Sequence, residues 1–134
     1  MADGFRALVL DEAEKGVSAS IQQLSDDQLP EGDVTVAISH STLNYKDGMV
    51  LKGIGRLVRK YPHVPGIDFA GTVETSESAS YKAGDKVILT GWHVGEAHWG
   101  GYAQKARVNS DWLVPLPEGM SEKRSMAIGT AGFT

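Results

Sequence analysis

The chain has 134 residues, of which 41% are hydrophobic and 22% are charged, so it allows one globular domain with a modest core. Its formal net charge of −4 argues against nucleic acid or an anionic membrane as the main partner, because either favours a strongly basic face. The absence of cysteine excludes disulfides and Cys-type zinc sites and favours a reduced, cytoplasmic setting, and no apolar run has the length of a transmembrane helix.

Alternation of apolar and polar residues predicts six or seven short strands. In chain order they cover residues 5–11, 17–25, 34–39, 67–75, 85–90, 102–108 and 112–116. The third strand is the clearest, because its apolar residues at 34, 36 and 38 share one face. Gly71, inside the fourth strand, indicates a place where another group approaches closely.

Two short helices are predicted between and after these strands. The first runs from about 45 to 52, with Asn44 as its N-cap, Asp47 completing an approximate capping box, and Gly53 at its end. The second runs from a cap at residue 121 to residue 128. The sequence therefore predicts a mainly β fold, a small barrel or curled sheet with short helices at its rim, and no linker that divides the chain.

The stretch Asn44–Tyr45–Lys46–Asp47 is the first candidate site. An amide, a phenol and a carboxylate at a strand-to-helix junction can order a ligand beside the free N–H groups of a helix. The more ordinary interpretation is that Asn44 caps the helix, Asp47 complements its dipole and Tyr45 packs. The residues alone favour this second interpretation.

The glycine-rich loop at 91–101 is the second candidate. His93, Glu96 and His98 are residue types that bind zinc, but their spacing is not that of the helical H-E-x-x-H motif. They are more simply loop residues around two aromatic anchors, Trp92 and Trp99. The residues alone therefore favour no metal here.

A basic segment, RLVRK, is the third candidate. Arg56, Arg59 and Lys60 stand together in an acidic chain and have the charge to meet the phosphates of a nucleotide or of coenzyme A. Basic runs are usually solvated faces, and that interpretation is favoured. No Walker loop, nucleophile elbow or G-x-G-x-x-G fingerprint is present.

Five motifs taken in order resemble the N-terminal part of the medium-chain dehydrogenase/reductase superfamily. They are LNYKD, PGIDFAGTV, AGDKVILTG, GGYAQKARV with LPEGM, and AIGTAGFT, and they cover nearly the whole chain. The stretch TGWHVGEAHWGGYAQ is similar to the branch of zinc-independent acrylyl-CoA reductases and quinone-oxidoreductase-like proteins. The resemblance implies a GroES-like, partly open β-barrel with short peripheral helices over residues 1–134. It also implies that the chain is an N-terminal fragment, ending where a Rossmann nucleotide-binding domain begins.

The resemblance also implies a reaction centre without metal. Zinc-dependent relatives have a cysteine ligand at the position of Asn44 and a histidine ligand at the position of Ile67, and neither side chain here is a zinc ligand. The glutamate of the same motif is matched by Asp68.

Several site residues are expected from the same resemblance. Tyr45 is the candidate catalytic residue, Asn44, Tyr45, Asp47 and Thr130 are the candidate cofactor-binding residues, and Arg56 is the candidate contact for the acyl-CoA substrate. The proton donor is left open between Tyr45, a backbone N–H and the cofactor ribose.

The expected function is an NADPH-dependent 1,4-reduction of an α,β-unsaturated acyl-CoA thioester such as acrylyl-CoA. The full-length protein is expected to be a cytoplasmic homodimer that needs no nucleic acid, membrane or metal, and this chain alone is expected to be inactive. The alternatives are a quinone oxidoreductase of the same superfamily and a non-catalytic GroES-like binding module. A zinc alcohol dehydrogenase is disfavoured by Asn44 and Ile67.

Overall fold

The computed structural model describes residues 4–133 and shows a mainly β protein with two helices, as predicted. The strands and helices are β1 (Gly4–Glu12), β2 (Val17–Ser25), β3 (Val34–Ser41), α1 (Tyr45–Lys52), β4 (Asp68–Ser76), β5 (Lys86–Thr90), β6 (Lys105–Val108), β7 (Leu113–Pro115) and α2 (Glu122–Phe133). Single turns of 3-10 helix lie at Asp26–Gln28 and Ser110–Trp112.

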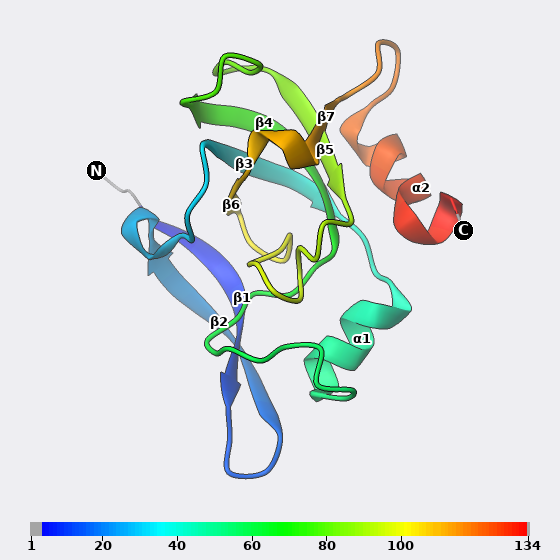
Figure 1. Ribbon diagram of the computed structural model, residues 1–134. Coiled ribbons are helices and arrows are strands. Elements are labelled where there is room, and N and C mark those ends of the chain that lie inside the picture. The colour runs from blue at the N-terminus through cyan, green and yellow to red at the C-terminus, as the bar shows by residue number, and fades with distance from the viewer. Residues whose placement is uncertain (1–3, 134) are drawn as a thin grey trace.

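The strands form one curled sheet with a hairpin beside it. The five-stranded sheet has the order β6-β3-β4-β5-β7, with every neighbouring pair antiparallel, and β1 and β2 form a separate antiparallel hairpin. The hairpin adjoins the β6 edge through the bridge between Ala7 and Ala103. Within residues 4–133 no pairing joins β2 to β7, so the curl stays open there. Figure 1 shows the hairpin on one side of the molecule and α2 on the other.

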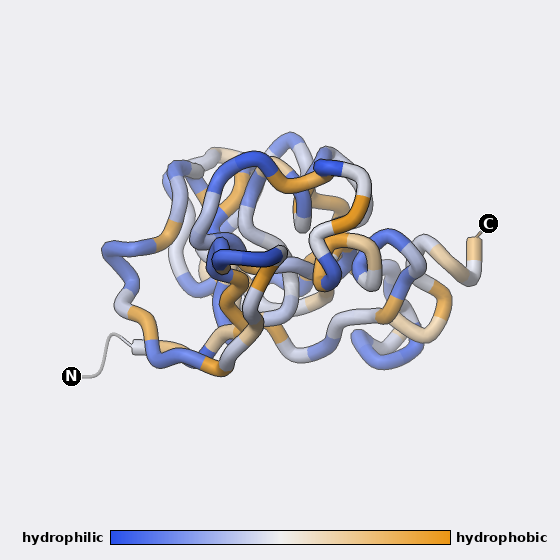
Figure 2. Tube along the Cα trace, turned by 90° about the horizontal axis from the view of Figure 1, so that it is seen from below, coloured by the Kyte–Doolittle hydropathy of each residue, from blue (hydrophilic) through white to orange (hydrophobic). Residues whose placement is uncertain are grey.

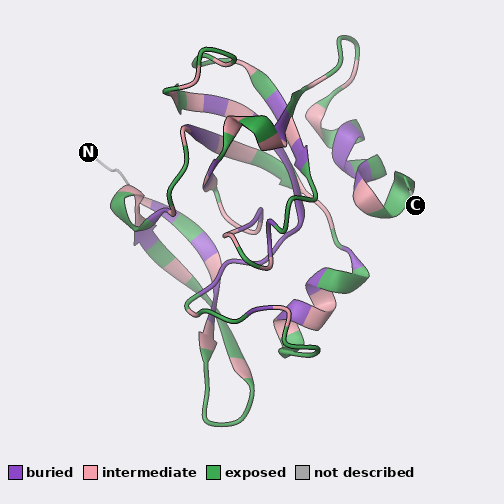
Figure 3. Ribbon diagram, in the orientation of Figure 1, coloured by how far each residue is buried: buried purple, intermediate pink, exposed green. Residues whose placement is uncertain are grey.

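The main core fills the concave side of the sheet, because alternate residues of the central strands point inward. Figure 3 shows buried residues concentrated along these strands, whereas the tip of the β1–β2 hairpin is exposed. The fully buried members of this main core include Val34, Val36, Phe69, Val87 and Leu89. Two smaller clusters lie under β1 and under α1.

Gly71 illustrates how the sheet constrains its residues. A Cβ at this position would overlap the carbonyl of Ala37 on β3, where the register between β3 and β4 shifts. The close approach predicted at this glycine is therefore confirmed, and the approaching group is the neighbouring strand.

Helix α1 has the bounds that the sequence predicts. Asn44 is its N-cap in an extended conformation, and Gly53 ends it in the left-handed region with φ 69°. Helix α2 begins one residue after Ser121, whose hydroxyl accepts the N–H of Arg124 at 3.0 Å, but it runs past residue 128. Its continuation follows a break at Gly129.

The sixth strand is shorter than predicted. It begins at Lys105 rather than at residue 102, because the segment before it crosses another loop. Gly101 and Tyr102 donate their N–H groups to the carbonyls of Gly66 and Pro65, at 2.9 and 3.0 Å, instead of joining β3.

Apolar residues are distributed among many short segments. Figure 2 shows hydrophobic and hydrophilic stretches alternating along the chain. Neither helix within residues 4–133 is long and apolar enough to cross a membrane.

Candidate functional site

One edge of the five-stranded sheet gathers segments that are far apart in the sequence. At this edge β3 ends, β4 begins at Asp68, and β5 ends at Thr90, which pairs with Asp68. Helix α1 starts just beyond β3, and α2 packs against β3 and β4. Six residues from these segments are connected by hydrogen bonds, and we call them the carboxylate cluster: Thr42, Asn44, Asp47, Asp68, Tyr102 and Thr130.

Asp68 is the most heavily bonded member of the carboxylate cluster, and it is fully buried. Its Oδ2 accepts the backbone N–H of Thr130 at 2.8 Å, the hydroxyl of Thr42 at 3.0 Å and the amide Nδ2 of Asn44 at 3.2 Å. Its Oδ1 accepts the hydroxyl of Thr130 at 2.6 Å. These four donors replace the water that a buried carboxylate loses.

Asp47 is the second fully buried carboxylate, in the first turn of α1. It accepts the backbone N–H groups of Asn44 and Ile67, each at 3.0 Å, and Nδ2 of Asn44 at 3.2 Å. The first of these bonds is one half of the predicted capping box. The positive end of the helix dipole adds to the stabilisation of the carboxylate here. Asp47 therefore ties the start of α1 to the loop before β4.

Asn44 is buried, and its two polar atoms differ in their surroundings. Nδ2 lies within hydrogen-bond distance of Thr42 Oγ1 at 2.8 Å as well as of both carboxylates. Oδ1 is also buried and faces the N–H of Asp47 as the other half of the capping box, but no hydrogen bond of ordinary geometry reaches it from residues 4–133. A buried acceptor that lacks a good hydrogen bond destabilises the folded protein by about 1–3 kcal/mol. A hydrogen-bond donor from outside the chain would therefore stabilise this oxygen.

Tyr102 is a member of the cluster that sequence reasoning missed. Its hydroxyl donates to the carbonyl of Thr42 at 2.7 Å. Burial raises the pKa of Tyr102 above its ordinary value of 10.0, and the charges of Asp47 and Asp68 raise it further, so the phenol keeps its proton. The only hint in the sequence is its place after two glycines, which allow the backbone to approach residues 65–66 closely.

Thr130 reaches the cluster because α2 breaks one residue earlier. Gly129 has φ 47° and ψ −162°, a conformation that is nearly confined to glycine. A Cβ there would lie 2.8 Å from Thr42 Cγ2 and 3.0 Å from Asp68 Oδ2. The break places both the N–H and the hydroxyl of Thr130 on the carboxylate of Asp68.

Tyr45 stands at the rim, outside the cluster. It is 88% exposed, and its hydroxyl makes no hydrogen bond to any of residues 4–133. Together with Leu43, Asn44, Met49 and Ile54 it lines an open, mainly apolar pocket of about 550 Å³. Leu43 and Ile54 are also exposed, so this rim is the apolar border of the cluster.

The structure thus brings together four of the five sequence-predicted site residues. Asn44, Asp47 and Thr130 are in the carboxylate cluster, and Tyr45 is adjacent at its rim. Arg56 lies beyond the end of α1 on an exposed loop, with φ 53°, and lines neither the cluster nor the rim pocket.

The candidate metal ligands of the glycine-rich loop are only partly together. His93 Nδ1 is 3.8 Å from Glu96 Oε2, and that carboxylate pairs with Lys46 at 3.2 Å. His98 instead donates its Nε2 to the carbonyl of Arg107 at 2.7 Å. Within residues 4–133 no group of three or more His, Cys, Asp or Glu side chains is arranged to hold a metal ion.

The two tryptophans of this loop differ. Trp99 packs against the cluster under β1 and donates Nε1 to the carbonyl of Pro62 at 3.2 Å, as expected of an anchor. Trp92 is 57% exposed and has a left-handed backbone, with φ 57°. The prediction that Trp92 is an anchor is therefore wrong, because the turn that follows β5 directs it outward.

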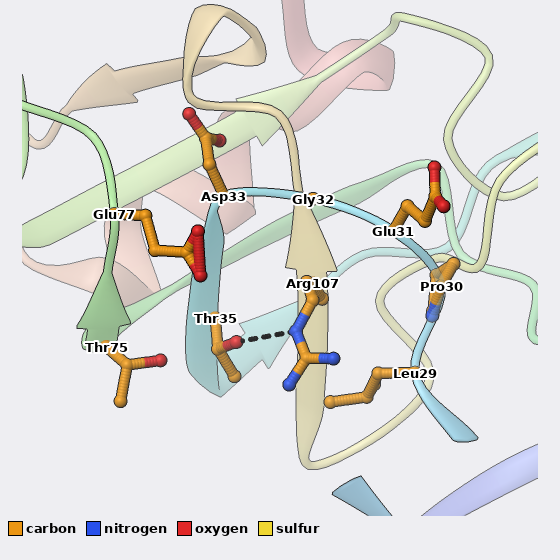
Figure 4. A pocket seen from close by; sticks show the side chains of 9 residues that line it. All are labelled: Leu29, Pro30, Glu31, Gly32, Asp33, Thr35, Thr75, Glu77 and Arg107. Atoms are coloured by element: carbon orange, nitrogen blue, oxygen red, sulfur yellow. Dashed lines mark hydrogen bonds between the residues drawn. The ribbon is translucent and has the colours of Figure 1, made fainter. Parts of the chain in front are cut away.

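A separate polar groove of about 570 Å³ lies beside β3 and β6 (Figure 4). Arg107 is fixed in it by donating Nε to Thr35 Oγ1 at 3.0 Å, and Glu31, Asp33 and Glu77 line the same groove. It shares no residue with the carboxylate cluster.

Comparison with known proteins assigns the fold to a family. Residues 30–118 match the model of the alcohol dehydrogenase GroES-like domain. This range contains the whole five-stranded sheet and α1, and it includes every cluster residue except Thr130.

Two relatives extend this similarity over nearly the whole chain. The acrylyl-CoA reductase AcuI of Ruegeria pomeroyi is 64% identical over 132 residues, covering 97% of this chain and 40% of that protein. The putative quinone oxidoreductase YhfP of Bacillus subtilis is 42% identical over 134 residues, covering 100% of this chain and 41% of that protein. The chain thus spans about 40% of the length of these relatives.

Solved structures agree with this assignment. The YhdH oxidoreductase of Salmonella enterica in complex with NADP superposes with a TM-score of 0.93 at 54% identity, over 96% of this chain and 40% of that one. The structure of B. subtilis YhfP with NAD bound gives a TM-score of 0.94 at 41% identity, over 98% of this chain and 40% of that one.

Proposed function

The chain belongs to the alcohol dehydrogenase GroES-like domain family, and on this basis we propose that it is the N-terminal part of the catalytic domain of an enoyl-thioester reductase. The full-length enzyme uses NADPH, without zinc, to reduce α,β-unsaturated acyl-CoA such as acrylyl-CoA. The observation that carries the proposal is the 64% identity with an acrylyl-CoA reductase along 97% of the chain.

The proposal includes a division of labour between domains. Residues 1–134 form the GroES-like segment, and a nucleotide-binding domain follows them in the full-length protein. We propose that the full-length protein is a cytoplasmic homodimer and that the nucleotide-binding domain forms the contact between its subunits. Light scattering of the purified full-length protein can test whether it is a dimer. The exposed apolar side chains Leu43, Tyr45 and Ile54 support a further domain closing over the rim.

The residues present fit a nicotinamide cofactor. Asn44 Oδ1 is a buried acceptor that needs a donor, and the carboxamide and ribose hydroxyls of nicotinamide nucleotides supply N–H and O–H donors. We propose that Asn44 accepts such a bond, while Asp47 and Asp68 hold its Nδ2 and so fix which way the amide points. Both carboxylates are buried and bonded within the chain, so we assign them to positioning.

When bound, NADPH supplies the hydride that goes to the β-carbon of the unsaturated thioester. Negative charge then develops on the thioester oxygen as the enolate forms, and a proton reaches the α-carbon. Tyr45 has an exposed hydroxyl at the rim, and we propose that it donates a hydrogen bond to that oxygen. Two hydrogen bonds hold Thr130 on Asp68, just after the break in α2. We propose that Thr130, held in this place, contacts the nicotinamide.

The test is turnover by the full-length protein. We expect oxidation of NADPH with acrylyl-CoA, no reaction with saturated alcohols, and no loss of activity after treatment with chelators. The last expectation follows from the residue types of Asn44 and Ile67, which offer zinc neither a thiolate nor an imidazole. Absence of turnover, or inactivation by chelators, would contradict the proposal.

A quinone oxidoreductase is the second candidate, favoured by the 42% identity with YhfP over all 134 residues. The same preparation distinguishes the two, because a quinone reductase oxidises NADPH with a quinone and not with acrylyl-CoA. A non-catalytic binding module would oxidise NADPH with neither.

A further inference from the structure

The chain from the middle of α1 to the start of β4 has an unusual charge balance. From Gly48 to Ile67 the chain has four cations, Lys52, Arg56, Arg59 and Lys60, and no carboxylate, although the whole chain has more acids than bases. Arg59 and Lys60 line one groove together, whereas Lys52 lines the rim pocket beside Tyr45. Charge and shape therefore coincide at Arg59 and Lys60.

This hollow is a groove of about 680 Å³ bounded by three segments, residues 28–30, 57–63 and 93–99. Two of its walls are fixed to each other by hydrogen bonds. Trp99 donates Nε1 to the carbonyl of Pro62 at 3.2 Å, and His63 donates Nε2 to the carbonyl of Gly95 at 2.8 Å. The groove is therefore preformed, which lowers the entropic cost of binding a ligand.

The charges in the groove favour an anion. Arg59 and Lys60 are exposed, and neither makes a hydrogen bond or an ion pair with any of residues 4–133. Among the described residues that line the groove Glu96 is the one acidic side chain, and it is already paired with Lys46 at 3.2 Å. A ligand phosphate can thus meet two uncompensated cations.

The aromatic residues of the groove add a second element of recognition. Trp99 and Tyr61 are both partly exposed and line the same hollow as the cations. Cations for phosphates beside aromatic side chains for a base are the combination by which proteins bind nucleotides.

The groove begins next to the candidate site. Lys46 follows Tyr45 in the first turn of α1, and its partner Glu96 lines the groove. A long ligand whose reactive end lies at Tyr45 can therefore continue past this ion pair into the groove.

We propose that this groove binds the phosphorylated adenosine end of the thioester substrate, with Arg59 and Lys60 on its phosphates and the base against Trp99. The inference rests on the proposed function, since it assumes a coenzyme A thioester at Tyr45. Of the three basic residues that the sequence offers for phosphates, Arg59 and Lys60 line the groove and Arg56, the expected substrate contact, does not.

The first experiment measures binding without turnover. Adenosine 3′,5′-bisphosphate is titrated into the full-length protein by calorimetry in saturating NADP⁺, so that the cofactor site is filled. Substitution of Arg59 and Lys60 by glutamine is expected to raise the Kd about tenfold for each charge removed, as loss of a charge-assisted hydrogen bond predicts. The matched control removes two exposed cations outside the groove, Lys15→Gln with Lys123→Gln, and is expected to leave the Kd unchanged.

Two outcomes of the titration would overturn the proposal. One is the absence of binding in the wild-type protein. The other is an equal loss of affinity in the groove variant, in the control pair and in Arg56→Gln, because that result indicates general charge attraction rather than a site.

The second experiment separates this inference from the proposed function. Turnover is compared for acrylyl-CoA and for acrylyl-pantetheine, which has the same reactive group and no nucleotide. The Arg59→Gln/Lys60→Gln variant is expected to raise KM for acrylyl-CoA at least tenfold, with kcat and all parameters for acrylyl-pantetheine unchanged. Equal effects of the double substitution on both thioesters would overturn the groove proposal. If instead the wild-type protein reduces neither thioester, the proposed function is overturned, and the titration alone tests the groove.

Discussion

Asp68→Ala provides a direct test of how the carboxylate cluster holds α2 in place. The backbone N–H of Thr130 donates to Asp68 Oδ2 at 2.8 Å, and the hydroxyl of the same residue donates to Oδ1 at 2.6 Å. Alanine removes both acceptors and leaves the helix on the far side of Gly129 without this attachment to β4.

The size of the effect follows from the charge of the acceptor. A hydrogen bond to a charged group contributes about 1.5–3 kcal/mol, and 1.4 kcal/mol corresponds to a factor of ten in an equilibrium. Local opening around Thr130 should therefore become about 10- to 100-fold more frequent in the variant. Asp68→Asn, which keeps the shape and one acceptor oxygen, should give a smaller increase.

The assay is amide hydrogen exchange of the full-length protein, read by mass spectrometry on peptides that cover residues 126–133. Exchange reports local opening without requiring two-state unfolding of the whole protein. Asp111→Ala, which removes an exposed carboxylate, is the matched control and should leave this exchange unchanged. If Asp68→Ala exchanges at the wild-type rate in this segment, the carboxylate does not hold α2 and the positioning role is wrong.

Further predictions concern residues in or near the same site. Tyr45→Phe should lower kcat for acrylyl-CoA about 100-fold, the loss expected for an oxyanion donor, whereas Tyr81→Phe should leave it unchanged; equal kcat values would assign that donor elsewhere. Gly129→Ala should cost about 1–3 kcal/mol in chemical unfolding, because φ 47° strains any side chain there. Burial lowers the pKa of His63 below its ordinary 6.5, so the unfolded chain binds a proton there more readily than the folded protein does. The free energy of unfolding should therefore fall as the pH drops below 6.5. In unfolding measured over a range of pH, His63→Gln should make that fall smaller. Tyr102→Phe should destabilise the protein by about 1 kcal/mol in the same assay through loss of its 2.7 Å hydrogen bond, and no change would show that this bond contributes nothing.

Local patterns in the sequence were sufficient for which elements form and for the ends of α1, but not for the start of β6 or the end of α2. Helix α1 has its predicted bounds because Asn44 and Gly53 act through the backbone within a few residues of themselves. The strands follow from alternation, which records the side of the sheet that each residue faces. The residue types at 44 and 67, which offer zinc neither a thiolate nor an imidazole, are likewise a property of the sequence alone.

Only the tertiary structure decided which of these residues meet. Asn44 is 24 positions from Asp68, and Thr130 is 62 positions from it, so no local rule relates them. Their contact depends on how β4 is placed beside α1 and on the break in α2 at Gly129. Tyr102 was missed because its burial depends on the loops that cross at Gly66. Trp92 was misjudged because its exposure depends on the turn after β5. Both features are set by packing between segments that are distant in the sequence.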